Sequence, residues 1–436
     1  LLAALIPLSL VQGCASTQSS GYGKPSGFLV DYDRLNPGKN GGANWVSPDL
    51  DLDKYIAFNV KNVEVRTAAA LGRDGFATED ARRIARRRLP WMVFDYIDGA
   101  AGRETGAVRN RAAFDDLPLR SRILRDVSQR DLTSSVFGKP TKAPFGISPM
   151  GMCNLSAPGA DMMLARLAAR EGVPLGVSTV SSTAMEPLIE EAEGNAWFQL
   201  YFSGDGVGTF KLVERAKAAG YKTLVLTVDV PEVGRRPREL RHGFKMPFKI
   251  GPKQFVDFAL HPRWSLTSLF AGKPQMANFE MDGYDFDRTE SRARADWETL
   301  ARLRDTWGGN LVVKGVLDVE DAVALKATGV DAVQVSSHGA RQLESAPSPF
   351  SLLPHMRAAL GPDFPIFFDS GLRSGEDVLK ALHAGADYVF FGRILQFAIA
   401  AGGEAGLARL WNVLSDEMSI AMAQTGISSL KGLRGS

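Results

Sequence analysis

The stretch Ala332-Val333-Gln334-Val335-Ser336-Ser337-His338-Gly339-Ala340-Arg341 runs from a short apolar segment into a polar turn. Counting this one, eight such apolar runs occur, at residues 145–149, 175–180, 197–201, 224–230, 311–316, 332–336, 366–369 and 388–391. Amphipathic segments such as 161–168 and 210–219 lie between most of them. Apolar strands that alternate with helices are typical of a parallel sheet covered on both faces. Eight units over roughly 250 residues predict an α/β fold, a (β/α)8 TIM barrel, with a doubly wound sheet as the alternative.

The composition sets limits on the class of protein. The chain has 436 residues, of which 45% are hydrophobic and 23% charged, as in an ordinary globular protein. A net charge of +2 gives no field that would favour nucleic acid. The two cysteines, Cys14 and Cys153, make no disulfide framework, and the five histidines are scattered. We therefore expect neither a nucleic-acid partner nor a metal site.

The N-terminal part differs from the rest. Residues 1–10 hold only apolar, Pro and Ser side chains, which suits the apolar region of a secretory signal. Val11-Gln12-Gly13-Cys14 follows, and residues 1–63 resemble the start of bacterial lipoproteins. We interpret residues 1–14 as a signal-like segment, with a disordered apolar tail as the alternative. Residues 15–77, rich in Gly, Ser, Asn and Pro, are expected to be a linker or a fused segment of low order.

The barrel itself is expected to span residues 78–432, with Thr78 as the N-cap of its first helix. A long loop is predicted after the fourth strand, at residues 237–298, where apolar, aromatic and basic residues mix without strand periodicity. Long loops inside compact domains are usually functional or disordered. Basic and aromatic content suits contact with a membrane surface. A plain lid over the barrel mouth is the alternative.

The active sites of such barrels form at the C-terminal ends of the strands. The polar residues at those ends are Gln199 and Tyr201 on the third run, Thr227 and Asp229 with Arg235 and Arg236 on the fourth, Lys314 on the fifth, Ser336, His338 and Arg341 on the sixth, Asp369, Gly371 and Arg373 on the seventh, and Gly392 and Arg393 on the eighth. Two arginines at one mouth suit bidentate capture of a carboxylate. Glycines followed by Arg after the last two strands suit a phosphate. A histidine here can act as a general base that a carboxylate orients.

Four motifs carry a resemblance to a known family: Leu89-Pro90 with Phe94-Asp95-Tyr96, Trp197-Phe198-Gln199-Leu200-Tyr201, Val313-Lys314-Gly315 and His338-Gly339-Ala340-Arg341-Gln342-Leu343. Together with the strand-end residues, they make residues 78–432 closely similar to the FMN-dependent 2-hydroxy acid oxidases and dehydrogenases. The resemblance implies an enzyme that binds FMN and oxidises an L-2-hydroxy acid to the 2-oxo acid.

The resemblance also implies roles for individual residues. The implied cofactor-binding residues are Pro149, Met150, Gly151, Ser178, Gln199, Thr227, Lys314, Ser336, Asp369, Gly371, Arg373, Gly392 and Arg393. The implied substrate-binding residues are Tyr96, Tyr201, Arg236, His338 and Arg341, with both arginines on the carboxylate. The implied catalytic residues are His338 as the base, Asp229 as the group that stabilises the imidazolium, and Tyr201 on the substrate hydroxyl. Ser337 departs from the family, which usually carries Asn there.

The subgroup follows from one position and from the loop stretches 260–266 and 274–279, which look like those of the membrane-associated lactate and mandelate dehydrogenases. Gly151 stands where oxidases of the family tend to carry Ala, and Gly is typical of the membrane-associated lactate and mandelate dehydrogenases. Val180 stands where glycolate oxidases place Trp, so the pocket should admit lactate or larger acids. These likenesses predict an L-lactate or L-mandelate type substrate, a quinone-type acceptor, a homotetramer, and a place at the cytoplasmic face of the inner membrane. A lipid anchor on Cys14 after export is the alternative location.

Three other functions stay open at this point. An oxidase of the same family would pass the electrons to oxygen instead of a quinone. A different FMN barrel enzyme, such as a type 2 isopentenyl diphosphate isomerase, fits less well because Arg236, Arg341 and Tyr201 suit a small carboxylate. A non-catalytic lipoprotein with a barrel fold is the third alternative, against which the complete set of catalytic side chains argues.

Overall fold

The computed structural model describes residues 36–37, 43–44, 77–244, 250–272, 275–281, 284–285, 292–431 and 433. The chain divides into two compact units, Leu1–Ala70 and Leu71–Ser436. In the first unit, β1 (Asn36–Pro37) and β2 (Ala43–Asn44) form an antiparallel pair. The signal-like segment, Cys14 and most of the 15–77 segment lie outside the described residues, so these interpretations stay predictions.

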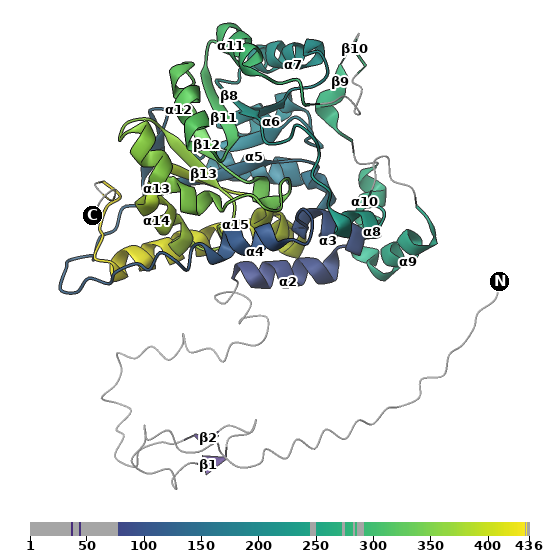
Figure 1. The fold of residues 1–436 in the computed structure, drawn as a ribbon. Helices are drawn as coiled ribbons and strands as arrows, with labels where there is room; N and C mark the ends of the chain where they lie inside the picture. Colours follow the sequence, from purple (N-terminus) through teal and green to yellow (C-terminus); the bar gives the residue numbers. More distant parts are fainter. Residues whose placement is uncertain are drawn as a thin grey trace. The chain divides into compact units, whose positions relative to one another are not determined.

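The second unit contains a closed barrel of eight parallel strands (Figure 1), which confirms the predicted (β/α)8 fold. Its strands are β5 (Phe145–Met150), β6 (Leu175–Ser178), β7 (Ala196–Tyr201), β8 (Thr223–Thr227), β11 (Asn310–Val316), β12 (Ala332–Val335), β13 (Ile366–Asp369) and β14 (Tyr388–Phe391). Each strand pairs with its neighbour in the sequence, and the pairing of β14 with β5 and of β8 with β11 closes the ring. Every predicted apolar run therefore forms one barrel strand.

Alternation along the strands explains why the runs are apolar throughout. In β13, Phe367 packs inside the barrel while Phe368 joins the outer core beneath the helices. In β14, Phe390 points inward in the same way. The hairpin of β3 (Ser134–Val136) and β4 (Lys139–Thr141) sends Phe137 against Phe367 and Trp197, with ring centroids 5.4 and 5.5 Å apart. This hairpin fills the barrel at the end opposite the strand C-termini.

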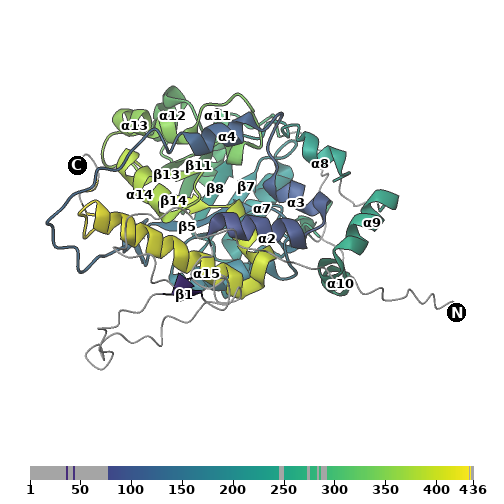
Figure 2. The same cartoon turned by 90° about the horizontal axis from the view of Figure 1, so that it is seen from below.

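Among the described residues, helices cover the outside of the barrel and three more precede it (Figures 1 and 2). The covering helices are α5 (Ala160–Glu171), α6 (Met185–Glu191), α7 (Val207–Ala218), α11 (Trp297–Thr306), α12 (Val319–Ala327), α13 (Pro349–Leu360), α14 (Gly375–Ala384) and α15 (Arg393–Gln424). The preceding helices are α2 (Thr78–Arg88), α3 (Trp91–Asp98) and α4 (Thr105–Ala112). In both views α2 runs beside α15, which is kinked at Gly403.

The first helix differs from the prediction by one position. Thr78 is its first helical residue and Ala77 is the N-cap. The Thr78 hydroxyl donates a hydrogen bond of 2.5 Å to the carbonyl oxygen of Arg373 in the loop after β13. The hydroxyl is therefore used for a tertiary contact, and the Asp80 carboxylate accepts the hydrogen bond from the Ala77 backbone N–H. The N-cap assignment of Thr78 was wrong.

The segment after the fourth strand is more regular than the predicted long loop. It contains α8 (Pro237–Arg241), α9 (Pro252–Leu260) and α10 (Pro262–Ala271), followed by an antiparallel pair, β9 (Glu280–Met281) and β10 (Tyr284–Asp285). Each of the three helices begins with proline, which suits a first helical position because its missing N–H has no intrahelical partner there. In Figure 1 α9 and α10 lie at the edge of the molecule beside α3 and α8.

Polar contacts fix this segment to α3. The buried carboxylate of Asp257 on α9 accepts hydrogen bonds from the backbone N–H groups of Trp91 and Met92, where the positive end of the α3 dipole lies. Arg238 on α8 forms ion pairs with Asp98 at 2.7 Å and with Asp95 at 3.2 Å. The segment is therefore anchored on one side, and its apolar side chains on the other side are exposed.

Candidate active site

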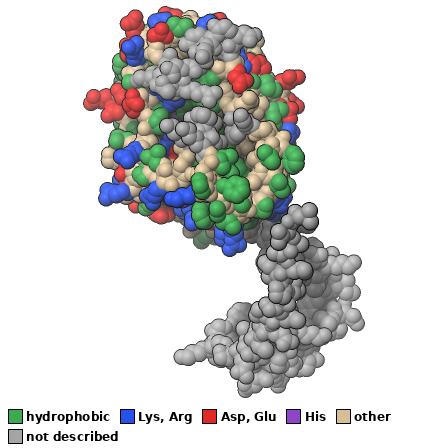
Figure 3. Space-filling view, turned by 90° about the vertical axis from the view of Figure 1, so that its right-hand side faces the viewer, with side chains coloured by type: hydrophobic (Ala, Val, Ile, Leu, Met, Phe, Trp, Pro, Cys, Tyr) green, Lys and Arg blue, Asp and Glu red, His purple; other side chains and the backbone are tan. Residues whose placement is uncertain are grey.

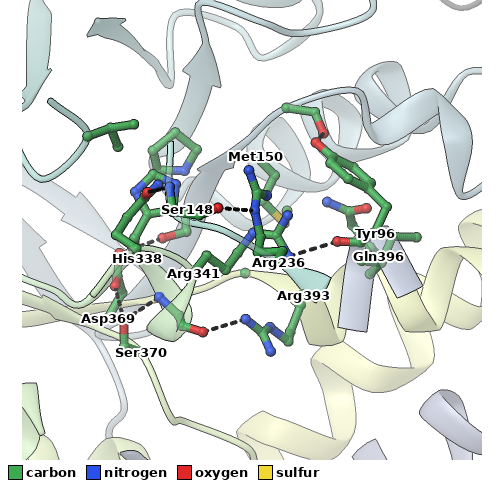
Figure 4. A pocket seen from close by; sticks show the side chains of 18 of the residues that line it. Tyr96, Ser148, Met150, Arg236, His338, Arg341, Asp369, Ser370, Arg393 and Gln396 are labelled. Atoms are coloured by element: carbon green, nitrogen blue, oxygen red, sulfur yellow. Dashed lines mark hydrogen bonds between the residues drawn. The ribbon is translucent and has the colours of Figure 1, made fainter. Parts of the chain in front are cut away.

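A cavity of about 700 Å³ opens at the C-terminal ends of the strands (Figure 4). Fourteen of the nineteen predicted site residues line it: Tyr96, Pro149, Met150, Gly151, Tyr201, Arg236, Lys314, His338, Arg341, Asp369, Gly371, Arg373, Gly392 and Arg393. The other five do not line it: Ser178, Gln199, Thr227, Asp229 and Ser336. They lie on the same strand ends, and two of them bond directly to lining residues, Asp229 to His338 and Ser336 to Lys314.

His338 follows β12 in the short 3-10 turn η5 (His338–Ala340). His338, Gly339 and Ala340 all have positive φ angles, of 56°, 64° and 61°. Such backbone conformations are costly for His and Ala, and they cluster at functional sites. The His338 Nδ1 atom lies 3.0 Å from the Asp229 Oδ1 atom. Burial, together with the charges of Lys314 and Arg341, lowers the pKa of His338 against the opposing effect of Asp229, so the imidazole is neutral at pH 7 and can accept a proton.

The two predicted arginines of the carboxylate clamp come together around a third side chain. The Oε1 atom of Glu239 accepts a hydrogen bond from Arg341 at 2.9 Å and another from Arg236 at 3.2 Å. Arg341 also donates to the backbone carbonyls of Tyr96 and Gly99, both at 2.8 Å. Burial, and then the charge of Arg341, lower the pKa of Arg236. The sequence analysis did not identify Glu239, although it lies only three residues after Arg236.

Both predicted tyrosines face the cavity as neutral phenols. Burial raises the pKa of Tyr96 and of Tyr201 to about 12. The Tyr96 hydroxyl donates to the carbonyl oxygen of Gly151 at 3.3 Å, and its ring stacks on Phe244 with centroids 4.3 Å apart. The guanidinium of Arg292 lies over the Tyr201 ring, 4.4 Å from its centroid. A phenol that keeps its proton is available to donate a hydrogen bond to a bound ligand.

A buried ionic network lies at the centre of the strand ends. The Lys314 Nζ atom is 2.8 Å from the Ser336 hydroxyl and 3.1 Å from the Asp369 carboxylate. Asp369 also accepts from Gln334 and Ser148, at 2.7 and 3.0 Å. Burial would raise the pKa of Asp369, but Lys314 and the hydroxyl groups outweigh it and keep the carboxyl ionised. The protein therefore uses both oxygens of Asp369 to hold Lys314 and its neighbours in place.

Arg373 and Arg393, which follow β13 and β14, supply the charge for an anion (Figure 4 shows Arg393 at the cavity wall). Burial lowers the pKa of Arg393 to about 9, with Arg373 and then Arg341 contributing as like charges. Burial likewise lowers the pKa of Arg373 to about 10. Two desolvated cations side by side are unfavourable by themselves and favour a bound dianion such as a phosphate. Barrels of this type often bind phosphate after these two strands.

The residues present fit FMN. The phosphate matches Arg373 and Arg393, and the volume of the cavity leaves room for the ring as well. On β7 and β8, the Gln199 Nε2 and Thr227 Oγ1 atoms are buried and, among the described residues, have no hydrogen-bond partner. Buried polar atoms normally have partners, so these two atoms indicate a ligand with polar edges at this place. The heteroatoms of an isoalloxazine ring supply such edges.

Two further residues in the site escaped the sequence analysis. The Asn110 side-chain amide on α4 donates to the Ser337 hydroxyl at 2.7 Å. An asparagine amide from another helix therefore lies next to the position where the family usually carries Asn. The Ser370 hydroxyl accepts from the Gly339 N–H at 2.9 Å and supports the turn of His338. Neither residue has a local sequence signal, because each acts through a contact over a long distance in the chain.

Comparison with known proteins shows where such a site occurs. Residues 85–436 match the model of the FMN-dependent dehydrogenase family. The (S)-mandelate dehydrogenase of Pseudomonas putida is 39% identical over 366 residues, which cover 82% of this chain and 92% of that protein. The L-lactate dehydrogenase of Pectobacterium atrosepticum is 37% identical over 369 residues, with 81% and 94% covered. The crystal structure of the monotopic membrane protein (S)-mandelate dehydrogenase superposes with a TM-score of 0.79 at 38% identity, covering 82% of this chain and 97% of that one.

The barrel and its cavity define a flavin-dependent oxidoreductase of 2-hydroxy acids. The chain belongs to the FMN-dependent 2-hydroxy acid dehydrogenase family. Its cofactor is FMN, and its reaction is the oxidation of an L-2-hydroxy acid. The predicted enzyme class and cofactor are confirmed. The roles of individual residues, the electron acceptor and the oligomeric state stay predictions.

Proposed function

We propose that the enzyme dehydrogenates L-2-hydroxy acids of the lactate or mandelate type with His338 as the base. The observation that carries this proposal is the position of a neutral, Asp229-bonded imidazole at the same cavity as Arg236 and Arg341 (Figure 4 shows His338 with both arginines). The arginines bind the substrate carboxylate, which fixes the α-carbon relative to the base. The relatives named for mandelate and lactate support the same class of substrate.

The chain's own residues then move one proton and hold charge. The Tyr201 phenol donates a hydrogen bond to the substrate hydroxyl and orients it. His338 takes one of the two protons that the substrate loses, and Asp229 stabilises the imidazolium that forms. FMN, when bound, would supply the acceptor for the two electrons and for the second proton. Lys314, buried and paired with Asp369, would supply a fixed positive charge to the bound cofactor.

The enzymatic test uses the purified chain with FMN under anaerobic conditions. L-lactate and L-mandelate should each bleach the flavin absorption, and the D-enantiomers should not, because the clamp and the base fix one face of the α-carbon. Failure of every L-2-hydroxy acid to bleach the flavin would refute the proposal. For the acceptor, we expect rapid reoxidation of the reduced enzyme by a soluble quinone and slow reoxidation by oxygen. The reverse order would identify an oxidase.

We also propose that the enzyme binds a membrane surface. The large apolar side chains of α9, α10 and the two residues before α9 that are more than half exposed are Ile250, Phe255, Val256, Leu260, Leu266, Leu269 and Phe270. We name this set the apolar patch. Figure 3 shows hydrophobic side chains gathered on the lower part of this face, with Lys and Arg beside them. Exposed apolar patches bordered by basic residues suit insertion into the headgroup region of an anionic bilayer.

The mode of membrane contact is at the surface. No helix among the described residues is long and apolar enough to cross a bilayer. One related structure is that of a monotopic membrane protein. The finer location that we propose is the cytoplasmic face of the inner membrane, where quinones are accessible, with a homotetramer as the assembly. Mass measurement of the detergent-solubilised enzyme tests the tetramer.

The membrane test compares two double variants in binding to vesicles of anionic phospholipid. Leu269→Ser with Phe270→Ser removes two side chains of the apolar patch that are 74% and 87% exposed. Ile123→Ser with Leu124→Ser removes two equally apolar side chains, 82% and 100% exposed, outside the patch. The first pair should abolish binding and the second should not. Equal binding by both would show that the patch is not the attachment site, and loss of membrane association in Cys14→Ala would point to a lipid anchor instead.

A further inference from the structure

Arg292 contributes a cation to the cavity that the reaction described above does not use. It lies in the segment between β10 and α11 and lines the cavity together with the clamp residues. Its guanidinium is placed over the ring of Tyr201, 4.4 Å from the ring centroid. Tyr201 is the residue that we expect to hold the substrate hydroxyl. Arg292 therefore lies next to the reacting part of the substrate, and on a different chain segment from the clamp.

The charges around the cavity exceed what the cofactor and a monocarboxylate need. Among the described lining residues the cations are Arg235, Arg236, Arg292, Lys314, Arg341, Arg373 and Arg393, and the anions are Glu239 and Asp369. Arg235 is exposed and is neutralised by water and salt. Asp369 offsets Lys314, and Glu239 offsets one arginine of the clamp. A phosphate dianion offsets Arg373 and Arg393, and one carboxylate offsets the rest of the clamp. Arg292 remains.

Arg292 lies close to the expected position of the substrate but is not one of the two clamp arginines. The charges of Arg292, Arg236 and Arg341 all act on the Tyr201 phenol, and Arg292 acts most strongly of the three. Tyr201 therefore shares the cavity with all three arginines, and the Arg292 guanidinium lies against its ring, 4.4 Å from the ring centroid. A substrate with its α-carboxylate on Arg236 and Arg341 and its hydroxyl at Tyr201 directs its remaining chain along apolar walls that include Val180, Val230 and Met276. The Arg292 guanidinium lines the same cavity as these walls.

We propose that Arg292 binds a second anionic group at the far end of the substrate, so that the preferred substrates are L-2-hydroxy dicarboxylic acids. This inference rests on the proposed function and specifies its substrate class. The chemistry at the α-carbon is unchanged: the 2-hydroxy acid loses two electrons and two protons, of which FMN, when bound, would take the electrons with one proton and His338 the other proton, and the remote carboxylate takes no part in bond breaking. Arginine suits this role because its planar fork binds a carboxylate through two parallel hydrogen bonds.

The test compares pairs of acids that differ only at the remote end. L-malate is paired with L-2-hydroxybutyrate, and L-2-hydroxyglutarate with L-2-hydroxyvalerate, because each pair has the same number of carbons. Flavin reduction is followed anaerobically, and kcat/KM is measured with a soluble dye. The wild-type enzyme should prefer one or both dicarboxylates by about 10- to 100-fold, the range that a charge-assisted hydrogen bond supplies.

Three variants test whether Arg292 causes the preference for dicarboxylates. Arg292→Gln should remove the preference, because kcat/KM should fall at least about tenfold more for each dicarboxylate than for its paired monocarboxylate, while Arg292→Lys should keep part of it because the charge remains. Arg294→Gln is the matched control, since Arg294 loses the same charge two residues away, is exposed and does not line the cavity. It should keep the full preference. FMN content of each variant, read from its absorption spectrum, confirms that the site is intact.

Two results would overturn the inference while leaving the proposed function in place. One is a wild-type enzyme that oxidises the monocarboxylates as well as the dicarboxylates or better. The other is an equal loss for both members of each pair in Arg292→Gln, which would give Arg292 a role in holding Tyr201 instead. If none of the four acids, L-lactate or L-mandelate bleaches the flavin, the proposed function fails, and this inference fails with it.

Discussion

The state of one imidazole sets the pH dependence of the reaction. Burial lowers the pKa of His338 below its ordinary value of 6.5, and only the neutral ring accepts a proton. Activity should therefore be complete above pH 6.5 and be lost as the pH falls through the lowered pKa. The measurement is kcat/KM from about pH 4.5 to about pH 8, which reports groups of the free enzyme. An acid limb centred above pH 6.5 would contradict the assignment.

Asp229→Asn tests the partner of that base. Asp229 raises the pKa of His338 through its charge and hydrogen bond, so its loss should move the acid limb to still lower pH. The plateau should fall by about 10²-fold or more, because the imidazolium formed in the reaction loses its counter-charge. The shift of the acid limb is the informative change. Loss of a merely structural residue would lower the plateau but leave the acid limb in place. Unchanged FMN content is the control.

Gly151 lies so close to Val180 that the structure leaves no room for a side chain at position 151. A Cβ atom added there would lie 2.5 Å from Val180 Cγ2 and 3.6 Å from the Tyr96 hydroxyl. Val180 has a stiff, β-branched side chain, so Gly151→Ala should lower the free energy of unfolding by about 1–3 kcal/mol. Urea unfolding of the holoenzyme measures it. In a Val180→Ala background the same substitution should cost much less, and an equal cost in both backgrounds would rule out this contact as the cause.

Single residues also show why part of the site was not predictable. His338, the arginines and Lys314 could be found because their side chains end strands, and the sequence shows where strands end. Asn110 and Ser370 act through contacts made only after folding. Ser337 departs from the usual Asn of the family, but the side-chain amide of Asn110 lies beside it. Thr78 has the composition of an N-cap, but a tertiary acceptor takes its hydroxyl.

The elements were predicted unequally well. Barrel strands are buried on both faces, so each appears as an uninterrupted apolar run between polar turns, and all eight were located. The helices of the segment after β8 have no such pattern, since α10 buries no residue and exposes apolar side chains. Their best signals are the prolines at positions 237, 252 and 262, which begin the three helices. Apolar periodicity fails to predict a helix such as α10, which buries no residue in the protein core.

The short helix α8 has an effect beyond its length, because it carries Glu239 between the two clamp arginines. Glu239→Gln removes the negative charge and leaves two buried guanidinium groups facing each other. We expect the free energy of unfolding to fall by about 2–4 kcal/mol, as when one partner of a buried ion pair is lost. A 2-oxo acid product should then recover more stability in the variant than in the wild type, because its carboxylate replaces the missing charge.

Thermal unfolding with and without pyruvate measures both effects of Glu239→Gln. Glu298→Gln is the control. It removes the same charge from the exposed start of α11, where we expect little effect on stability. A variant as stable as the wild type, with the same response to pyruvate, would show that Glu239 does not balance the clamp. The test concerns ligand-free stability, so it is independent of which hydroxy acid is oxidised.

At the scale of the whole molecule, the barrel should not need the N-terminal unit. The second compact unit begins at Leu71, and the family match begins at residue 85. A chain that starts at residue 71 should keep its FMN, its unfolding temperature within about 2 °C and its turnover, since a change of that size corresponds to only about 1.5 kcal/mol in a unit of this length. Differential scanning calorimetry and the dye assay provide the measurement.

A second truncation, starting at residue 90, tests whether the barrel needs α2. It removes α2, whose Ala81 and Ala85 are fully buried in the core and whose Thr78 hydroxyl bonds to the backbone of Arg373 beside the phosphate site. Loss of this helix exposes apolar surface on α15 and frees the loop that carries Arg373. We therefore expect a large fall in the unfolding temperature together with loss of FMN. If the longer truncation bound FMN as tightly as the full chain, α2 would be an appendage and the functional unit would begin at α3.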